Sequence, residues 1–193
     1  STHATPVTIS LDNDSIKQGE TLTVSIDAGD QRNARVGAWV GVFRPDVESK
    51  DWNIFQYTKD IISGDIEVTV NTVETGDFEV RYFPSENSLV PSATARFVVE
   101  RDETRPPVEL LVNTPTIISG ESVSVTWNAN DKVNAASSSW IGIFSEHSRS
   151  VKEYEVFDYT GDLVAGSMEI ELYGTPGLYH VKYFSGGQEL ASA

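Results

Sequence analysis

The sequence predicts an all-β fold of two tandem immunoglobulin-like antiparallel β-sandwiches, and the first observation behind this prediction is an internal repeat. "AWVGVF" at 38–43 returns as "SWIGIF" at 139–144, and "GDFEVRYF" at 76–83 returns as "GLYHVKYF" at 177–184. Both pairs are separated by the same interval, so the chain contains one unit written twice.

The second observation is the hydrophobic pattern within each copy. Residues 21–26 and 122–127 alternate apolar with mainly hydroxyl side chains, which is the period of a half-buried strand. Turn-forming stretches such as "SGD", "TGD" and "GTPG" separate the predicted strands, and no stretch sustains a helical period. About seven short strands per hundred residues are typical of an immunoglobulin-like sandwich.

The repeat also sets the predicted domain boundaries. We predict a first sandwich over 1–100, which begins with an extended N-terminal segment, a linker over 101–106 and a second sandwich over 107–193. The linker is rich in charge and leads into a Pro-Pro pair, a composition that favours an extended and stiff connection.

The two copies differ in their last strand. "TARFVVE" at 94–100 alternates as a final strand in the first copy, whereas the second copy ends at Ala193, which the repeat interval aligns with about Ala93. The second sandwich is therefore predicted to lack its final strand, leaving a groove of core side chains beside an unpaired strand edge. The predicted acceptor edge consists of Leu178, His180, Lys182 and Phe184.

Three interpretations of this missing strand stay open. The sequence is a truncated piece whose full chain supplies the strand, or the strand comes from another molecule, or the domain tolerates a frayed edge. The candidate donor is the N-terminal segment, in which apolar residues alternate with polar ones. The residues predicted to point into the groove are Thr5, Val7, Ile9 and Leu11. Because the repeat also makes 6–12 the first strand of its own copy, the segment is either swapped outright or bridges two sandwiches.

Charge and composition exclude several classes of function. The chain has 29 acidic and 14 basic side chains and a net charge of −15, which disfavours nucleic acid and anionic membrane surfaces as partners. No apolar run approaches the roughly 18 residues of a membrane span. The absence of cysteine excludes disulfides, thiol nucleophiles and thiolate metal sites.

Catalytic signatures are also missing from the sequence, so we predict that the protein is not an enzyme and needs no cofactor. Its three histidines, His3, His147 and His180, lie outside any pattern of serine, histidine and acid, and there is no nucleophile elbow, phosphate-binding loop or zinc motif.

Acidic and amide residues at predicted strand ends leave calcium (Ca²⁺) open as an alternative to ordinary turn geometry. These residues are Asp12, Asn13, Asp14, Asp27, Asp30, Asn128, Asn130 and Asp131, with Glu100, Asp102 and Glu103 at the domain junction. Asn13 begins the only N-x-S/T sequon and is a candidate N-glycosylation site if the protein is secreted by a eukaryote.

The repeated motif resembles SKICH-type immunoglobulin-like modules, and related "WIGIF" strands occur in sandwich modules attached to secreted hydrolases. The residues that carry the resemblance are Trp39, Gly41, Phe43, Tyr57, Tyr82 and Phe83, with Trp140, Gly142, Phe144, Tyr159, Tyr183 and Phe184. The resemblance implies a binding or targeting module without catalysis.

The sequence thus favours a secreted, non-enzymatic structural protein that polymerises with itself, head to tail, by strand exchange. The alternative is a tandem binding module for a protein or carbohydrate ligand, excised from a larger protein, and a third hypothesis is an accessory domain of a hydrolase. Covalent glycans are further predicted partners.

Overall fold

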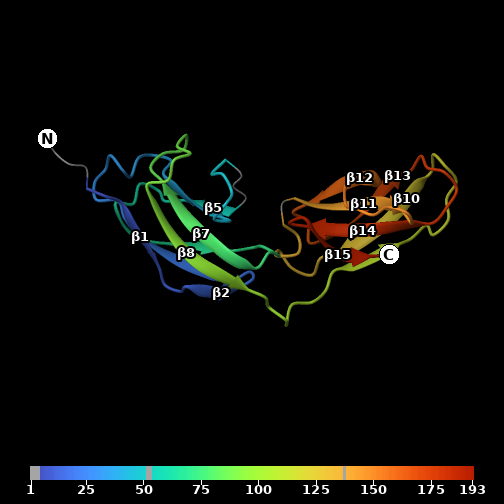
Figure 1. Ribbon diagram of the computed structural model, residues 1–193, viewed down its shortest axis with the longest axis horizontal. Helices are drawn as coiled ribbons and strands as arrows, with labels where there is room; N and C mark the ends of the chain where they lie inside the picture. Colours follow the sequence, from blue (N-terminus) through green and yellow to red (C-terminus); the bar gives the residue numbers. More distant parts are fainter. Residues whose placement is uncertain (1–4, 51–53, 137) are drawn as a thin grey trace. The chain divides into compact units, whose positions relative to one another are not determined.

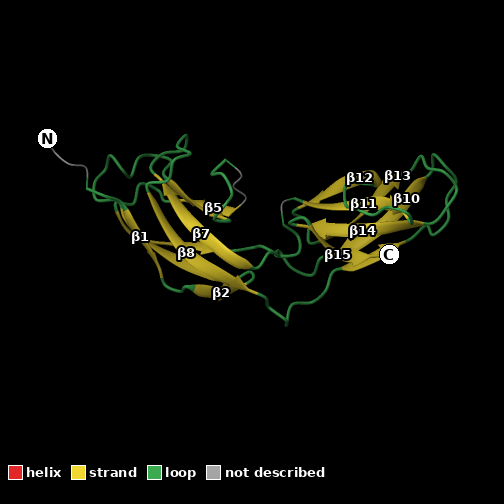
Figure 2. Ribbon diagram, in the orientation of Figure 1, coloured by secondary structure: helices red, strands yellow, loops and turns green. Residues whose placement is uncertain are grey.

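The structure, a computed structural model, describes residues 5–50, 54–136 and 138–193. Every regular element in the described residues is a β-strand (Figures 1 and 2). The chain divides into two compact units, Ser1–Asp102 and Glu103–Ala193, and each unit is described by itself.

The first unit contains a three-stranded sheet in the order β1-β3-β6 and a five-stranded sheet in the order β2-β8-β7-β4-β5. All neighbours are antiparallel except β2 and β8, which are parallel. The strands are β1 (Thr8–Leu11), β2 (Ser15–Lys17), β3 (Thr21–Asp27), β4 (Trp39–Phe43), β5 (Ile54–Tyr57), β6 (Ser63–Thr69), β7 (Gly76–Phe83) and β8 (Ala93–Glu100).

The second unit contains a three-stranded sheet in the order β13-β10-β9 and a four-stranded sheet in the order β12-β11-β14-β15, all antiparallel. The strands are β9 (Glu109–Val112), β10 (Ser122–Asn128), β11 (Ser139–Ser145), β12 (Tyr154–Gly161), β13 (Ala165–Glu171), β14 (Tyr179–Ser185) and β15 (Gln188–Ser192). Apart from β2, every strand of the first unit has a counterpart here.

The strand orders confirm the predicted tandem immunoglobulin-like sandwiches. In each unit the first, second and fifth main strands form one sheet, while the third, fourth, sixth and last form the other, as in immunoglobulin-like domains. Apolar residues from both sheets of a unit meet in one buried cluster, so the sheets pack face to face.

Alternation along the strands builds these cores. In β3, Leu22, Val24 and Ile26 are buried, whereas the threonines and the serine between them are not. In β10 the same pattern buries Val123 and Trp127. The predicted half-buried strands are therefore confirmed in both copies.

The "WVGVF" and "WIGIF" motifs place aromatic rings on the other face of the sheet. Trp39 stacks on Phe83 with ring centroids 4.1 Å apart, and in the second sandwich Trp140 stacks on Phe184 at 4.3 Å. A Cβ at Gly41 would lie 2.6 Å from the Phe43 ring, so the central glycine leaves room for the aromatic side chains.

The predicted absence of a final strand in the second sandwich is wrong in part. Residues 188–192 form β15, which pairs with β14 across a tight turn at Gly186 and Gly187, both with positive φ. The repeat interval misaligned this region because the connection between the last two strands is shorter here than in the first sandwich. Ala193 pairs with Val181, as Ala95 pairs with Val80 in the first sandwich.

Candidate functional site

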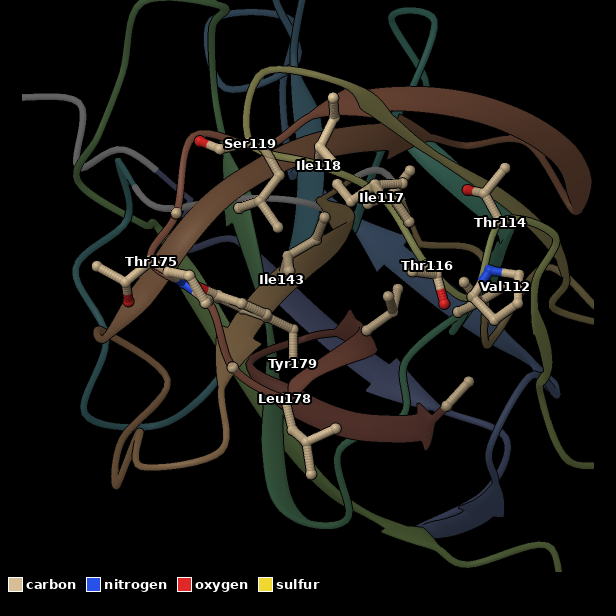
Figure 3. Close-up of a pocket in the computed structure, with 18 residues that line it drawn as sticks. Val112, Thr114, Thr116, Ile117, Ile118, Ser119, Ile143, Thr175, Leu178 and Tyr179 are labelled. Atoms are coloured by element: carbon tan, nitrogen blue, oxygen red, sulfur yellow. The ribbon is translucent and has the colours of Figure 1, made fainter.

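An apolar groove of about 650 Å³ runs along one edge of the second sandwich, beyond the end of β15 (Figure 3). Its side chains come from the segment between β9 and β10, from the loop before β14, and from core strands. No lining residue is charged: Val112, Thr114, Pro115, Thr116, Ile117, Ile118, Ser119, Val123, Ile143, Leu172, Gly174, Thr175, Pro176, Gly177, Leu178, Tyr179, Val181 and Ala193.

The floor of the apolar groove belongs to the hydrophobic core. Val123, Ile143 and Val181 are buried members of that core and also line the groove. The rim is exposed to solvent, because Ile118 is 71% exposed and Leu178 is 68% exposed. Large exposed apolar side chains around a core-lined hollow are typical of surfaces that another chain segment or a ligand covers.

The first sandwich fills the corresponding space with its own chain. The end of β8 buries Phe97 and Val99 in the core, and β2 adds the buried Ile16. The strand β2 pairs in parallel with β8 from Ser15 to Lys17, so β8 is held on both sides. The apolar groove of the second sandwich is therefore the counterpart of a position that a strand occupies in the first.

In the second sandwich, β15 covers only part of β14. Its pairing ends with Ala193 on Val181, and no described strand pairs with Tyr179 or His180 on that side. Ile117, the counterpart of Ile16, is only partly buried and lies outside any strand. Within the described residues, the backbone of Tyr179 and His180 thus has no strand partner on the β15 side.

In the first sandwich, the side chain of Gln18 helps to hold the end of β8 in place. The buried Gln18 donates from Nε2 to the carbonyl of Val73 at 2.6 Å, and its Oε1 accepts from the amide of Asp102 at 3.2 Å. Ser119 occupies the corresponding place in the second sandwich and lines the apolar groove. Its short side chain cannot span the same distance.

The predicted acceptor edge is only partly where the sequence placed it. Leu178 lines the apolar groove, but Lys182 and Phe184 pair with β15, so that part of the edge is not free. Phe184 is buried against Trp140, and His180 is exposed. Besides Leu178, the groove is lined by Tyr179 and Val181, which alternate with the predicted residues along β14 and point to the other face of the sheet. It is also lined by Ile117 and Ile118, which the sequence analysis missed.

The predicted donor segment forms the first strand of its own sandwich in this structure. Thr8–Leu11 pairs with β3, and the partly buried side chains of Val7, Ile9 and Leu11 pack against the core. Thr5 is exposed, and residues 1–4, including His3, lie outside the described residues.

Matching asparagines hold the entry to the first strand of each sandwich. Asn33 donates from Nδ2 to the carbonyl of Thr5 at 3.0 Å, and Asn134 donates to that of Pro106 at 3.2 Å. Nδ2 of each asparagine also donates to the backbone carbonyl five residues earlier, at Ala28 and at Ala129. Each first strand is thus anchored at its start.

The second sandwich adds an ion pair to this anchor. Arg105 donates to both carboxylate oxygens of Asp131, at 3.0 and 2.9 Å. Partial burial raises the pKa of Asp131, but hydrogen bonds from Arg105 and backbone amides outweigh burial and hold this pKa below its ordinary value. In the first sandwich the counterpart Asp30 pairs with Arg32 two residues later, and among the described residues it forms no ion pair with the segment that leads into β1.

Four of the residues considered for calcium stabilise turns of the chain. Asp27, Asp30, Asn128 and Asp131 each accept a backbone amide two or three residues later, which is the geometry of Asx turns. Among the described residues, no three histidine, aspartate or glutamate side chains form a group able to hold a metal. Asn13 is exposed between β1 and β2, where its glycosylation stays a prediction.

The chain thus belongs, by its architecture, to the proteins built from tandem immunoglobulin-like sandwiches, and its second sandwich has an apolar groove beside the last strand. Among solved structures, the chain is similar to the Escherichia coli adhesin FdeC, with 17% identity and a TM-score of 0.36, over 97% of this chain and 62% of that chain. It is also similar to a biofilm-associated protein BSP domain, with 7% identity and a TM-score of 0.35, over 95% of this chain and 28% of that chain.

A third similar structure contains the FN1–FN3 domains of chicken CNTN1, with 15% identity and a TM-score of 0.31, over 92% of this chain and 58% of that chain. The chain spans less than two thirds of each of these three structures. No protein-family model and no curated protein matches the chain, and the resemblance to SKICH-type modules is not confirmed. In the described residues, no helix is long and apolar enough to cross a membrane.

Proposed function

We propose that the protein is a non-enzymatic, extracellular structural subunit that assembles head to tail by strand exchange. An extended strand from a neighbouring copy fills the apolar groove of the second sandwich. The observation that carries this proposal is the internal comparison, because the corresponding space of the first sandwich holds the end of β8.

The first sandwich also indicates how the incoming strand runs. There, β8 is antiparallel to β7 and parallel to β2. A strand in the apolar groove would correspondingly run antiparallel to β14 and parallel to residues 116–118. It would place alternate apolar side chains opposite Tyr179 and Gly177, where the first sandwich has Phe97 and Val99.

The proposed donor is the N-terminal segment with Thr5, Val7, Ile9 and Leu11. Its apolar residues have the required alternation, and Thr5 to Leu11 carries no charge. Because the apolar groove is also uncharged, this contact joins two copies of a chain of net charge −15 without bringing like charges together.

Exchange requires β1 to leave β3 of its own sandwich. Both first strands, β1 and β9, pair over only four residues and have partly buried apolar side chains. The ion pair of Arg105 with Asp131 adds a contact at the entry to β9, and among the described residues Asp30 makes no such contact at the entry to β1, so β1 is the more easily released first strand. A heterologous contact of this kind does not close on itself and so produces a filament.

The test uses the exposed rim of the apolar groove, where substitutions leave the core intact. Ile118→Asp and Leu178→Asp place a charge on the path of the incoming strand, and Leu163→Asp is the matched control, because Leu163 is an exposed leucine of the same sandwich outside the groove. Sedimentation velocity and negative-stain microscopy should show filaments for the parent chain and the control, and monomers for both rim variants.

Deleting residues 1–12 should also prevent assembly, and a synthetic peptide of residues 1–14 should then raise the melting temperature of the second sandwich. A parent chain that stays monomeric at all concentrations, or rim variants that polymerise like the parent, would contradict strand exchange. Antibody labelling of intact cells of the source organism tests the extracellular location.

A further inference from the structure

A row of aromatic rings lies along β12, the edge strand of the second sandwich. Tyr154, Phe157 and Tyr159 are all exposed, and Tyr159 is 62% exposed. A register shift against β11 pairs Ile143 with Val156 but Phe144 with Tyr154, so Glu155 is an extra residue. This bulge brings Tyr154 onto the face that already carries Phe157 and Tyr159.

The aromatic row rests on a rigid base. Neighbouring ring centroids along the row are 4.8 Å apart between Tyr154 and Phe157 and 5.4 Å apart between Phe157 and Tyr159. Trp140 packs edge-on against both Tyr154 and Phe157, at 6.0 and 5.8 Å, and itself stacks on the buried Phe184. Rings held in this way lose little conformational freedom when a ligand binds.

At the corresponding edge the first sandwich also exposes two rings, Phe55 and Tyr57, but it covers another part of the same face. There the buried Arg81 donates to the carbonyls of Arg44, Pro45 and Val47, which ties the loop after β4 over the Phe43 ring. In the second sandwich the corresponding residue is Lys182, which instead pairs with Glu189 on β15 at 2.9 Å. The loop after β11 lacks this anchor, and Trp140 is less buried than Trp39.

Charge decides which partner suits the aromatic row. The loop before β12 carries Arg149, Lys152 and Glu153, and Glu155 follows within the strand, so both signs border the row. This mixture gives no advantage to a strongly basic or a strongly acidic partner. The net charge of −15 further disfavours sulfated or phosphorylated polymers.

We propose that the aromatic row of the second sandwich binds a neutral polysaccharide. The C–H face of a sugar ring is apolar and packs on an aromatic face, while its hydroxyl groups need hydrogen-bond partners. The carboxylate of the bulge residue Glu155 can accept hydrogen bonds, and the hydroxyls of Tyr154 and Tyr159 make none within the described part of the chain. A row of rings along an edge strand fits an extended chain of sugars. This inference does not depend on strand exchange.

Native affinity gels test the proposal with the full chain and four soluble probes: hydroxyethyl cellulose, β-1,3-glucan, galactomannan and, as the charged comparison, dextran sulfate. We expect at least one neutral polymer to retard the protein. Tyr159→Ala should weaken this retardation about three- to tenfold, and Phe157→Ala combined with Tyr159→Ala should abolish it. Tyr173→Ala is the matched control, because Tyr173 is an exposed tyrosine of the same sandwich outside the row.

Retardation by dextran sulfate alone, or by none of the four polymers, would overturn the proposal. Equal retardation of the parent chain and the double variant would do the same. Circular dichroism of each variant checks that the fold is kept, which is expected because the substituted side chains are exposed.

Discussion

The two sandwiches have the same order of strands but treat the space beside the last strand in different ways. In the first, a long β8 and the short β2 lie side by side and bury Ile16, Phe97 and Val99. In the second, a tight turn begins β15 early, and its pairing with β14 ends at Val181. Within the described residues, the space that corresponds to the end of β8 is lined in the second sandwich by apolar side chains of residues 112–119 and 174–179.

Extending β15 should produce the largest effect, because it would make the second sandwich resemble the first. Adding the sequence of residues 96–100, "RFVVE", after Ala193 continues the register and places a phenylalanine opposite Tyr179 and a valine opposite Gly177. Burying two apolar side chains should raise the free energy of unfolding of the second sandwich by about 3 kcal/mol.

Urea titration of the extended chain measures this change. The control extension "RSVSE" replaces the two inward side chains by serine and should give little stabilisation. Equal stabilisation by both extensions would mean that the apolar groove does not accept side chains as the first sandwich does. If copies assemble by the proposed strand exchange, the extended chain should also stop assembling.

A second prediction concerns the opposite face of each sandwich. Arg81→Ala removes the partner of the buried Glu79 and the anchor of the loop after β4, so it should cost about 3 kcal/mol. Lys182→Ala, at the corresponding place, breaks a more exposed ion pair and should cost less than about 1 kcal/mol. Chemical denaturation of the two variants compares them directly, and similar losses would show that the two faces are equally closed.

The smallest predicted effect is a difference in acid stability. The pKa of Asp131 is lowered in the folded chain, so its contribution to stability is present above its unfolded pKa and is lost as the pH falls below about 4. Arg105→Gln should therefore weaken the second sandwich near neutral pH and reduce its additional loss between about pH 4 and pH 2. Melting temperatures measured across this range, with and without the substitution, check the sign.

Much of the fold was predictable because its signals are local. Alternation of apolar and hydroxyl residues places β3 and β10, and the aromatic motifs recur at the same interval in β4 and β11. Equal intervals, however, contain no information about a turn that has changed length. The alignment of Ala193 with Ala93 was wrong for this reason, and the short β15 was missed.

A groove of core side chains beside β14 was predicted, but its lining was assigned to the side chains on the wrong face of that strand. A bulky aromatic residue such as Phe184 is expected in the core between the two sheets, but it packs on Trp140 on the outer face of its sheet. The rim residues Ile117 and Ile118 lie in a connection that forms no strand, where strand periodicity gives no signal. The local signal that the sequence offered for these rim residues was the occurrence of two consecutive isoleucines in a connection.

The tight turn at Gly186 and Gly187 also has a consequence for the order of folding. Strands β14 and β15 are neighbours in the sequence, so their hairpin needs only a short loop to close and can form within microseconds. The first sandwich must instead bring the distant β2 to β8, a slower step between residues far apart in the chain. The second sandwich can therefore pair β15 with β14 early in folding, before strands that lie far apart in the chain have met.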